Sequence, residues 1–474
     1  MNKLIGDRAF YSYMFKLAIP IALQTVLMAA FQLIDASMVA KLGNEAMAGV
    51  NMAGRWTFIL MITLFGIGSG CSILYSQYWG VKDEAGIRRV FGMSLMHMLG
   101  VAVVMSLVMA LFPRQLITVF AGGAKPEIVE YGTQYMQLIA FNCLFFAFNY
   151  AVTAVLRSTE EVHIPLFTSL VAICVNTGLN YVLIYGHFGA PALGVRGAAI
   201  ATIVSSAVQT VLLVVQSRWR RHMAFIHIRQ WFDFSRALLF KVYKVVAPVL
   251  ANEVLWVLGN SVYLMVFGRM VVQGSTAAVP AAYSLYGSID QLLFAFIIGL
   301  SSACGVIVGK SVGEGDTEGA WRSAVRFVAF GTAFACLLGL AEALLRVPVV
   351  NLIGPEALAA DLTKKILLMG SIAMPLKMLA MLFIVAIFRA GGRPEVGAVL
   401  DVACVWFIGA PLVLLGGLVW HWDFTMVFPL IFAEDIFKVG IGLVLFLRRK
   451  WIRRLTDDDV TILPSAVPEP AEQP

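Results

Sequence analysis

Long apolar runs separated by short polar segments dominate the chain. About twelve of these runs reach roughly twenty residues, which is the length that an α-helix needs to cross the hydrocarbon core of a bilayer. They lie at residues 13–39, 53–79, 91–113, 132–156, 163–186, 195–217, 241–268, 280–309, 324–346, 365–389, 396–420 and 426–447. The pattern predicts an all-α integral membrane protein with about twelve transmembrane helices.

The two halves of the chain repeat each other. Positions in the first half recur at one constant offset in the second: Gly66, Ser69, Cys71, Gly80, Asp83, Gly86 and Arg89 correspond to Gly299, Ser302, Cys304, Gly313, Asp316, Gly319 and Arg322. Pro20 is echoed by Pro248, and Arg157 by Arg389. Because each copy holds six predicted spans, we expect two lobes in parallel orientation, related by an axis along the membrane normal, with a central cavity between them.

This repeat sets the predicted domain boundaries. Residues 1–217 form the N-terminal lobe and residues 241–450 the C-terminal lobe, each with six helices. Residues 218–240 form a basic linker. The acidic, proline-rich composition of residues 451–474 predicts a disordered tail.

Composition and charge support a membrane protein and indicate its orientation. The chain is 60% hydrophobic and only 13% charged, with a mean hydropathy of +0.85. Its net charge of +7 comes from Lys and Arg in short loops between apolar runs, so we expect no nucleic-acid partner. The loops on the side of the two termini are the richer in Lys and Arg, which predicts a multi-pass plasma-membrane protein with both termini in the cytoplasm.

The N-terminal half carries one carboxylate inside an apolar run, and several polar side chains that could accompany it. Asp35 lies in the first span, where an unpaired acid costs several kcal/mol. Asn176 and Asn180 lie one helical turn apart in the fifth span, and Ala198 and Thr202 one turn apart in the sixth. This all-oxygen set would suit Na⁺, whereas a proton needs only Asp35. Interhelical hydrogen bonding by the two asparagines is the structural alternative.

The C-terminal half carries a different set of ionisable residues. Glu253 lies in the seventh span, Asp290 in the eighth and Lys377 in the tenth. Because a buried acid and a buried base are each costly alone, Glu253 and Lys377 at similar depth suggest an ion pair. Such a pair would be structural if permanent, and would couple ion or substrate movement to conformation if it opened during transport.

Several stretches together make the chain similar to the multidrug and toxic compound extrusion (MATE) family of secondary transporters. They are LAIPIALQTVLMAAFQLID, QYWGVKD, GKSVGEGD, LRSTEEVHIP, NTGLNYVLIYGHFGAPALGVRGAAIAT and FRAGGRPEVGAVLD, together with the pairing of Pro248 and Glu253. The resemblance covers about residues 10 to 450. It implies antiport driven by Na⁺ or H⁺, export of organic cations, drugs or related amphipathic metabolites, and no other cofactor.

The resemblance also implies a cation site on Asp35, Asn176, Asn180, Thr202 and the carbonyl of Ala198. The position of Asn180 is often Asp in relatives, so this chain keeps only one formal counter-charge there.

Some relatives have a second cation site built from a Glu in helix 7 and an Asp in helix 10. Glu253 matches the first, but Lys377 and Met378 stand near the second position. A Na⁺ site there is therefore in doubt, and Lys377 supplies a positive charge instead.

Three other functions remain as alternatives. A lipid-linked precursor flippase of the same superfamily would line its cavity with Arg, whereas the embedded ionisable residues here are mostly acidic. An enzyme would need a cluster of catalytic residues, which the sequence lacks, and a channel fits the two-lobe repeat poorly. No nucleotide-binding P-loop pattern occurs, so we expect a monomeric, gradient-driven transporter of small molecules in contact with membrane lipid.

Overall fold

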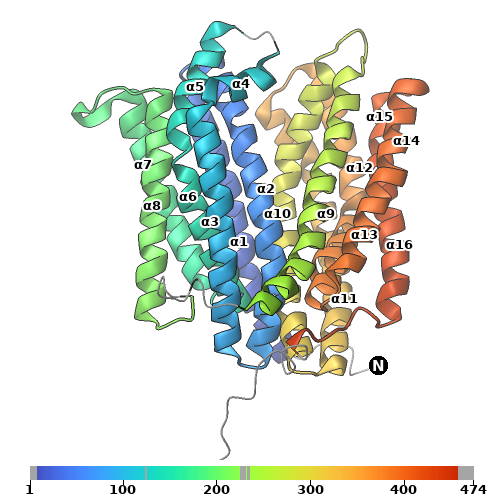
Figure 1. The fold of residues 1–474 in the computed structure, drawn as a ribbon. Coiled ribbons are helices and arrows are strands. Elements are labelled where there is room, and N and C mark those ends of the chain that lie inside the picture. Colours follow the sequence, from blue (N-terminus) through green and yellow to red (C-terminus); the bar gives the residue numbers. More distant parts are fainter. Residues whose placement is uncertain (1–7, 123–124, 225–230, 232–234, 457–474) are drawn as a thin grey trace, which may run out of the picture.

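The computed structural model describes residues 8–122, 125–224, 231 and 235–456. The predicted tail lies outside the described residues from position 457 onward, as do residues 225–230 and 232–234 of the predicted linker. Apart from one isolated bridge between Val272 and Ser275, the described chain consists of helices and their connections (Figure 1). The prediction of an all-α membrane fold is confirmed.

The first lobe, here called the N-lobe, contains the elements up to residue 219. These are α1 (Arg8–Ala40), α2 (Asn44–Gly80), α3 (Glu84–Leu111), α4 (Pro113–Ala121), α5 (Pro126–Ile139), α6 (Asn142–Ser158), α7 (His163–Tyr185), η1 (His187–Gly189) and α8 (Val195–Trp219). The span expected at residues 132–156 is a bent pair, because α5 and α6 meet at 53°. Figure 1 draws this lobe in blue to green.

The second lobe, here called the C-lobe, begins at residue 236. Its elements are α9 (Arg236–Arg269), α10 (Ala278–Gly313), α11 (Thr317–Ile353), α12 (Ala357–Met381), η3 (Leu382–Phe388), α13 (Pro394–Cys404), η4 (Val405–Gly409), α14 (Ala410–Leu414), η5 (Leu415–Val419), α15 (Phe424–Val427), η6 (Phe428–Phe432) and α16 (Ala433–Leu447). Ten helices among the described residues are long and apolar enough to span a membrane, or eleven with the bent pair. The predicted last span is divided among α15, η6 and α16.

Equivalent caps begin the third helix of each lobe, as the sequence repeat predicts. The Asp83 carboxylate accepts a hydrogen bond from the Gly86 amide at 2.9 Å, and Asp316 accepts one from Gly319 at 2.8 Å. An acceptor at the N-cap satisfies a backbone amide that has no partner within the helix. The two aspartates therefore fix where α3 and α11 begin.

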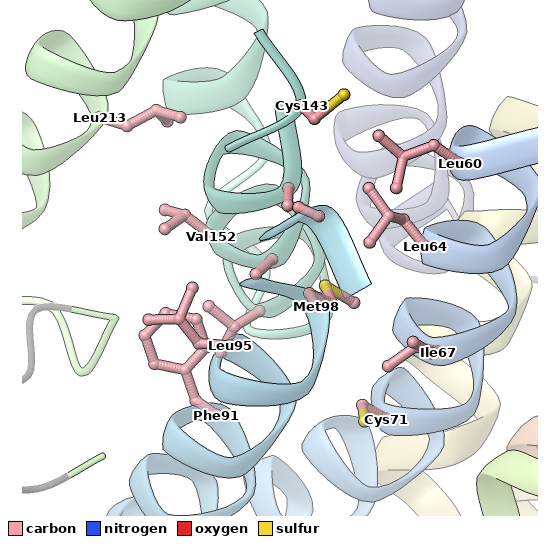
Figure 2. Packing of buried hydrophobic residues seen from close by; sticks show 14 of the residues in the cluster. Leu60, Leu64, Ile67, Cys71, Phe91, Leu95, Met98, Cys143, Val152 and Leu213 are labelled. Atoms are coloured by element: carbon pink, nitrogen blue, oxygen red, sulfur yellow. The ribbon is translucent and has the colours of Figure 1, made fainter. Parts of the chain in front are cut away.

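The N-lobe is held together by interlocking apolar side chains from α2, α3, α6 and α8. Figure 2 shows Leu64 of α2, Phe91 and Met98 of α3, Val152 of α6 and Leu213 of α8 among these buried residues. Because lipid is as apolar as these side chains, close van der Waals packing stabilises such a bundle more than exclusion of water does. This packing gives the N-lobe a scaffold against which α1 and α7 can be positioned.

The two lobes contact each other along only one half of the length of their helices. We call the end of the bundle at which α1 begins and α2 ends the basal end. A Cβ added to Gly70 of α2 would lie 2.8 Å from the Val246 Cα of α9, and one added to Gly299 of α10 would lie 2.9 Å from the Ala18 carbonyl oxygen of α1. Small residues thus allow close helix contact across the lobes in their basal halves.

Beyond Gln24, helix α1 has its hydrogen-bond partners in its own lobe. The Gln24 amide donates to Ser169 Oγ of α7 at 2.8 Å, and the Tyr185 hydroxyl of α7 donates to the Met38 carbonyl of α1 at 2.8 Å. The outer half of α1 is therefore held by the N-lobe, while its basal half packs on α10 of the C-lobe.

Candidate functional site

A chain of hydrogen bonds links α1, α7 and α8 inside the N-lobe. The Asn180 amide nitrogen lies 2.6 Å from Asp35 Oδ1 and 2.8 Å from Asn176 Oδ1, and donates to both. The two asparagines share one face of α7 because they are four residues apart. Asp35 therefore binds the face of α7 that carries the two asparagines identified in the sequence.

The chain continues from α7 to α8. The Asn176 amide donates to Thr202 Oγ1 at 3.3 Å and to Ser205 Oγ at 3.4 Å. The Thr202 hydroxyl donates to the Ala198 carbonyl at 3.0 Å. Ser205 was not among the predicted site residues, although it lies three residues after Thr202 on the same helix face.

Because the network is buried, any polar atom in it that lacks a hydrogen-bond partner is costly. Asn176 and Asn180 are completely buried, whereas Asp35 is half-buried. The Asn180 carbonyl oxygen, Oδ1, has no hydrogen-bond partner among the described residues. A buried acceptor without a donor is costly, and a carbonyl oxygen beside a carboxylate is a typical ligand pair for a hard cation. The donor set therefore fits Na⁺, and it also fits a proton on Asp35.

The three C-lobe charges singled out in the sequence lie in two separate ion pairs. Glu253 and Lys377 do not pair with each other. Glu253 Oε1 lies 2.7 Å from Arg389 Nη2, and Lys377 Nζ lies 2.7 Å from Asp290 Oδ1. Depth along a helix alone did not reveal which neighbouring helix each side chain faces.

A third cluster, here called the Lys438 cluster, joins α13 and α16. Lys438 is 3% exposed, and its ammonium lies 2.7 Å from Asp401 Oδ1, 2.8 Å from Glu434 Oε1 and 3.9 Å from Asp435 Oδ1. The Tyr263 hydroxyl of α9 donates to Glu434 Oε2. Three carboxylates thus surround one ammonium in the C-lobe.

The Lys438 cluster uses the helices that correspond to those of the N-lobe network. By the order of the repeat, α9, α13 and α16 are the counterparts of α1, α7 and α8. Tyr263 stands where the offset between Pro20 and Pro248 places the counterpart of Asp35. In the C-lobe, a tethered ammonium therefore lies among oxygen atoms on the equivalent helices.

A further set of polar contacts, here called the basal latch, joins the lobes at the basal end. Glu160, after α6, accepts hydrogen bonds from Lys310 Nζ of α10 at 2.7 Å and from Trp79 Nε1 of α2 at 3.0 Å. Burial alone would raise the pKa of Glu160, but hydrogen bonds from Lys310, Tyr13 and Trp79 and the charge of Lys310 hold it below its usual value. Glu160 is therefore a charged partner of the opposite lobe.

Backbone contacts reinforce the basal latch. The Gln77 amide nitrogen of α2 donates to the Ala390 carbonyl at 3.1 Å, and its carbonyl accepts from the Leu455 amide at 2.8 Å. One N-lobe side chain thus binds two C-lobe segments that are far apart in sequence. Together with Glu160, it closes the basal end of the structure.

Comparison with known proteins identifies a family model that matches both lobes. The model, described as MatE, matches residues 20–182 and 254–415. These ranges contain Asp35, Asn176 and Asn180 in the N-lobe and Asp290 and Lys377 in the C-lobe. They leave out α8 and α16, which complete the N-lobe network and the Lys438 cluster.

Two curated relatives show similarity over different lengths. The probable multidrug resistance protein YoeA of Bacillus subtilis is 27% identical over 303 residues, which is 63% of this chain and 64% of that protein. The probable multidrug resistance protein NorM of Thermotoga maritima is 22% identical over 453 residues, or 93% of this chain and 92% of the relative. The YoeA match thus spans less than two thirds of the relative's length.

A solved structure confirms the fold. A crystal structure of a mutant of the Vibrio cholerae MATE transporter VcmN superimposes with a TM-score of 0.84 at 16% identity, covering 94% of this chain and 98% of that one. At this level of identity the match concerns the path of the backbone, including the two-lobe arrangement.

Proposed function

Because the family model covers most of both lobes, this chain belongs to the MatE family, and we propose that it is a cation-coupled antiporter that exports small organic cations or related amphipathic molecules. The names of the relatives, as multidrug resistance proteins, support this reading. We further propose that it acts as a monomer in the plasma membrane, with both termini in the cytoplasm. The basal end would then face the cytoplasm, and the structure would be outward-facing.

The observation that carries the proposal is the N-lobe network with its unpartnered oxygen. In the structure, the Asn180 amide nitrogen faces Asp35. If this amide turned over, Oδ1 would lie beside the carboxylate, and two oxygens at that distance need a proton or a cation between them. Asp35, Asn176, Asn180, Thr202 and the Ala198 carbonyl would hold Na⁺, whereas Asp35 alone would hold a proton.

Coupling requires that the ion bind two conformations unequally. Asp35 on α1 reaches Asn180 on α7, while the basal half of the same α1 packs on α10 of the C-lobe. Occupation of the network by a cation would change how α1 is held by α7. Because α1 also forms part of the lobe interface, this change would bias the equilibrium between a closed and an open basal end.

The contacts of Lys377 favour an exporter over a flippase. A flippase for a lipid-linked precursor needs free positive charge in its cavity to bind pyrophosphate. Lys377, the basic side chain of the predicted tenth span, is already bound to Asp290 at 2.7 Å. Its charge is therefore compensated within the protein.

The test is ethidium efflux from proteoliposomes with a Na⁺ gradient and a pH gradient imposed separately. We expect at least one gradient to drive efflux, and Asp35→Asn to abolish it without loss of folding. Asp361→Asn is the matched control, because Asp361 forms only an exposed pair with Lys365. Undiminished gradient-driven efflux by Asp35→Asn, or no efflux under either gradient by the unmodified protein, would contradict the proposal.

A further inference from the structure

A second titratable site lies in the C-lobe, centred on Glu342 of α11. The side chain is 5% exposed, and neither carboxyl oxygen has a hydrogen-bond partner among the described residues. An ionised carboxylate in such a place has no described partner, and burial of an uncompensated charge costs several kcal/mol. Glu342 is accordingly the least compensated acid in the described part of this lobe's interior.

The position of Glu342 on α11 directs it towards α12. One helical turn earlier, a Cβ added to Gly339 would lie 2.3 Å from the Ser371 carbonyl oxygen of α12. Residues three apart share a helix face, so Glu342 lies on the same closely packed face. At this position it is near enough to Asp290 and Lys377 for their charges to act on it.

Asp290 and Lys377 form an ion pair, and an ionised Glu342 would compete with Asp290 for Lys377. Lys377 Nζ donates to Asp290 Oδ1 at 2.7 Å and to the Tyr286 hydroxyl at 2.7 Å. The Tyr286 hydroxyl donates in turn to Asp290 Oδ1 at 3.3 Å. The Lys377 ammonium therefore acts on two carboxyl groups, but it is bound to Asp290 alone.

No other described charge close by compensates Glu342. Helix α11 packs on α10 and on α12 with its extension η3, and ring contacts in its basal half join it to α1. The ionisable groups of these helices whose charges act on Glu342 are Asp290, Tyr286 and Lys377. On its own helix, Arg346 donates to the Ala343 carbonyl. Because Lys377 is bound to Asp290, Glu342 can be neutralised only by a proton or by a rearrangement of that ion pair.

We propose that Glu342 binds a proton in this conformation and, with Asp290, Lys377 and Tyr286, forms a proton site in the C-lobe that is separate from the Asp35 network. Protonation adds H⁺ to the carboxylate and leaves Lys377 with Asp290. Release of the proton to solvent restores the Glu342 carboxylate, which then competes with Asp290 for Lys377. The exchange would alter the contact between α11, which carries Glu342, and α10 and α12, which carry the ion pair.

This inference deepens the proposed function, on which it rests, because it names the proton as a coupling ion of the C-lobe. Transport of substrate would be linked to protonation at this site, whichever ion the N-lobe binds. The Glu253–Arg389 pair takes no part, since Arg389 already compensates Glu253. The N-lobe and C-lobe sites can therefore be separated by experiment.

Infrared spectroscopy tests the proton directly. Spectra of the purified full chain, recorded in H₂O and D₂O from mildly acidic to mildly alkaline solution, report protonated carboxylic acids by their carbonyl stretch. We expect Glu342→Gln to lack one such band that the unmodified protein shows, and the exposed control Glu127→Gln to keep it. A Glu342→Gln spectrum that retains every protonated-acid band would overturn the proposal.

Folding of the variants adds a second check. If the group at position 342 is neutral, the neutral amide of Glu342→Gln and the apolar side chain of Glu342→Leu are both tolerated. We expect melting temperatures equal to or above that of the unmodified protein. Failure of both variants to fold would mean that a charge is needed there, and would overturn the proposal.

Ethidium efflux then separates this inference from the proposed function. We expect Glu342→Gln to reduce the stimulation of efflux by a pH gradient about tenfold, a typical coupling between two sites. If the unmodified protein exports ethidium and Glu342→Gln retains full pH-gradient stimulation, this inference fails alone. If the unmodified protein exports nothing under either gradient while the infrared band is present, the proposed function fails and the proton site stands.

Discussion

Arg389 Nη2 lies 2.7 Å from Glu253 Oε1, and the two side chains are 3% and 10% exposed. Arg389 also donates to Ser69 Oγ of α2 at 2.9 Å, so the ion pair of the C-lobe is tied to the N-lobe. Its repeat counterpart Arg157 donates to Gln24 Oε1 at 2.6 Å. The two lobes thus place an arginine at equivalent positions, but Arg389 binds a carboxylate and Arg157 binds an amide.

Replacement of Glu253 by Gln should destabilise the protein strongly. The change leaves the buried Arg389 guanidinium without its counter-charge, and removal of one partner of a buried ion pair costs about 3–5 kcal/mol. Thermal unfolding in detergent measures the effect. The double variant Glu253→Gln/Arg389→Met should recover much of the loss, because it removes both charges.

An exposed ion pair provides the control for this experiment. Glu318 and Arg449 lie 2.8 Å apart but are 58% and 49% exposed. Glu318→Gln should change stability by less than about 1 kcal/mol, as is typical of surface pairs. Equal effects of the two Glu→Gln changes would show that Glu253 is not held as a charged partner of Arg389.

Replacement of Asn180 by Asp should increase the affinity of the N-lobe for Na⁺. The new carboxylate would stand beside Asp35 at the present distance of 2.6 Å, and two like charges so close require a cation or a proton. A ligand that binds only the folded state raises its stability. We therefore expect a larger rise in melting temperature with NaCl than with choline chloride, compared with the unmodified protein.

The combination Asp35→Asn/Asn180→Asp is the control for that variant. It exchanges the acid and the amide and returns the number of carboxylates to one. The added response to Na⁺ should disappear. A response to Na⁺ that is unchanged by Asn180→Asp would contradict a role for this network in cation binding.

The N-lobe network could be predicted from the sequence for a physical reason. A single acid in an apolar run needs a partner, and Asn176 and Asn180 share a helix face, so few arrangements satisfy Asp35. The contacts at 2.6 and 2.8 Å agree with that expectation. The role of these residues in ion binding stays a prediction.

The pairing inside the C-lobe could not be predicted in the same way. Glu253, Asp290, Glu342 and Lys377 lie on four different helices, and hydrophobic periodicity gives the depth of a residue but not the helix that it faces. The orientation of each helix depends on close contacts such as that of Gly339 with Ser371. The bend between α5 and α6 could not be predicted either, because it lies within one continuous apolar run.

The basal latch should control which end of the protein is open. Glu160→Gln replaces a charge-assisted hydrogen bond to Lys310 of the other lobe, which contributes about 1.5–3 kcal/mol to the closed basal end. Spin labels at Ala85 and Thr317, on different lobes and both exposed at the basal end, report the separation. We expect a larger fraction of long distances in Glu160→Gln.

Glu161→Gln is the matched control for the latch. Glu161 pairs with Arg220 at 3.3 Å, and Arg220 directly follows α8 of the same lobe. Loss of this pair should leave the distance distribution unchanged. If Glu160→Gln behaves like Glu161→Gln, the ion pair between the lobes does not hold the basal end closed.

His222 should make stability depend on pH at the basal end. Burial, and then the charge of Arg88, lower its pKa from 6.5 to about 4. The Ala224 amide donates to Nδ1 at 3.0 Å, so the neutral ring presents Nε2–H to the Thr159 hydroxyl, 3.0 Å away. The unfolded chain takes up a proton first, so this contribution is complete above pH 6.5 and declines as the pH falls to about 4.

Melting temperatures across that interval measure the effect of His222. The unmodified protein should lose more stability on acidification than His222→Gln, by at most about 3 kcal/mol. His163→Gln serves as the control, because His163 is exposed at the same end of the molecule. Parallel pH profiles for the unmodified protein and His222→Gln would exclude the contribution.

Removal of the Lys438 ammonium should destabilise the C-lobe. Lys438→Met leaves Asp401, Glu434 and Asp435 together without a positive charge, and we expect a loss of about 3–5 kcal/mol at neutral pH. Thermal unfolding at neutral pH measures the loss, with Lys365→Met as the control for an exposed pair. If Lys438→Met melts like Lys365→Met at neutral pH, the three carboxylates do not depend on this ammonium.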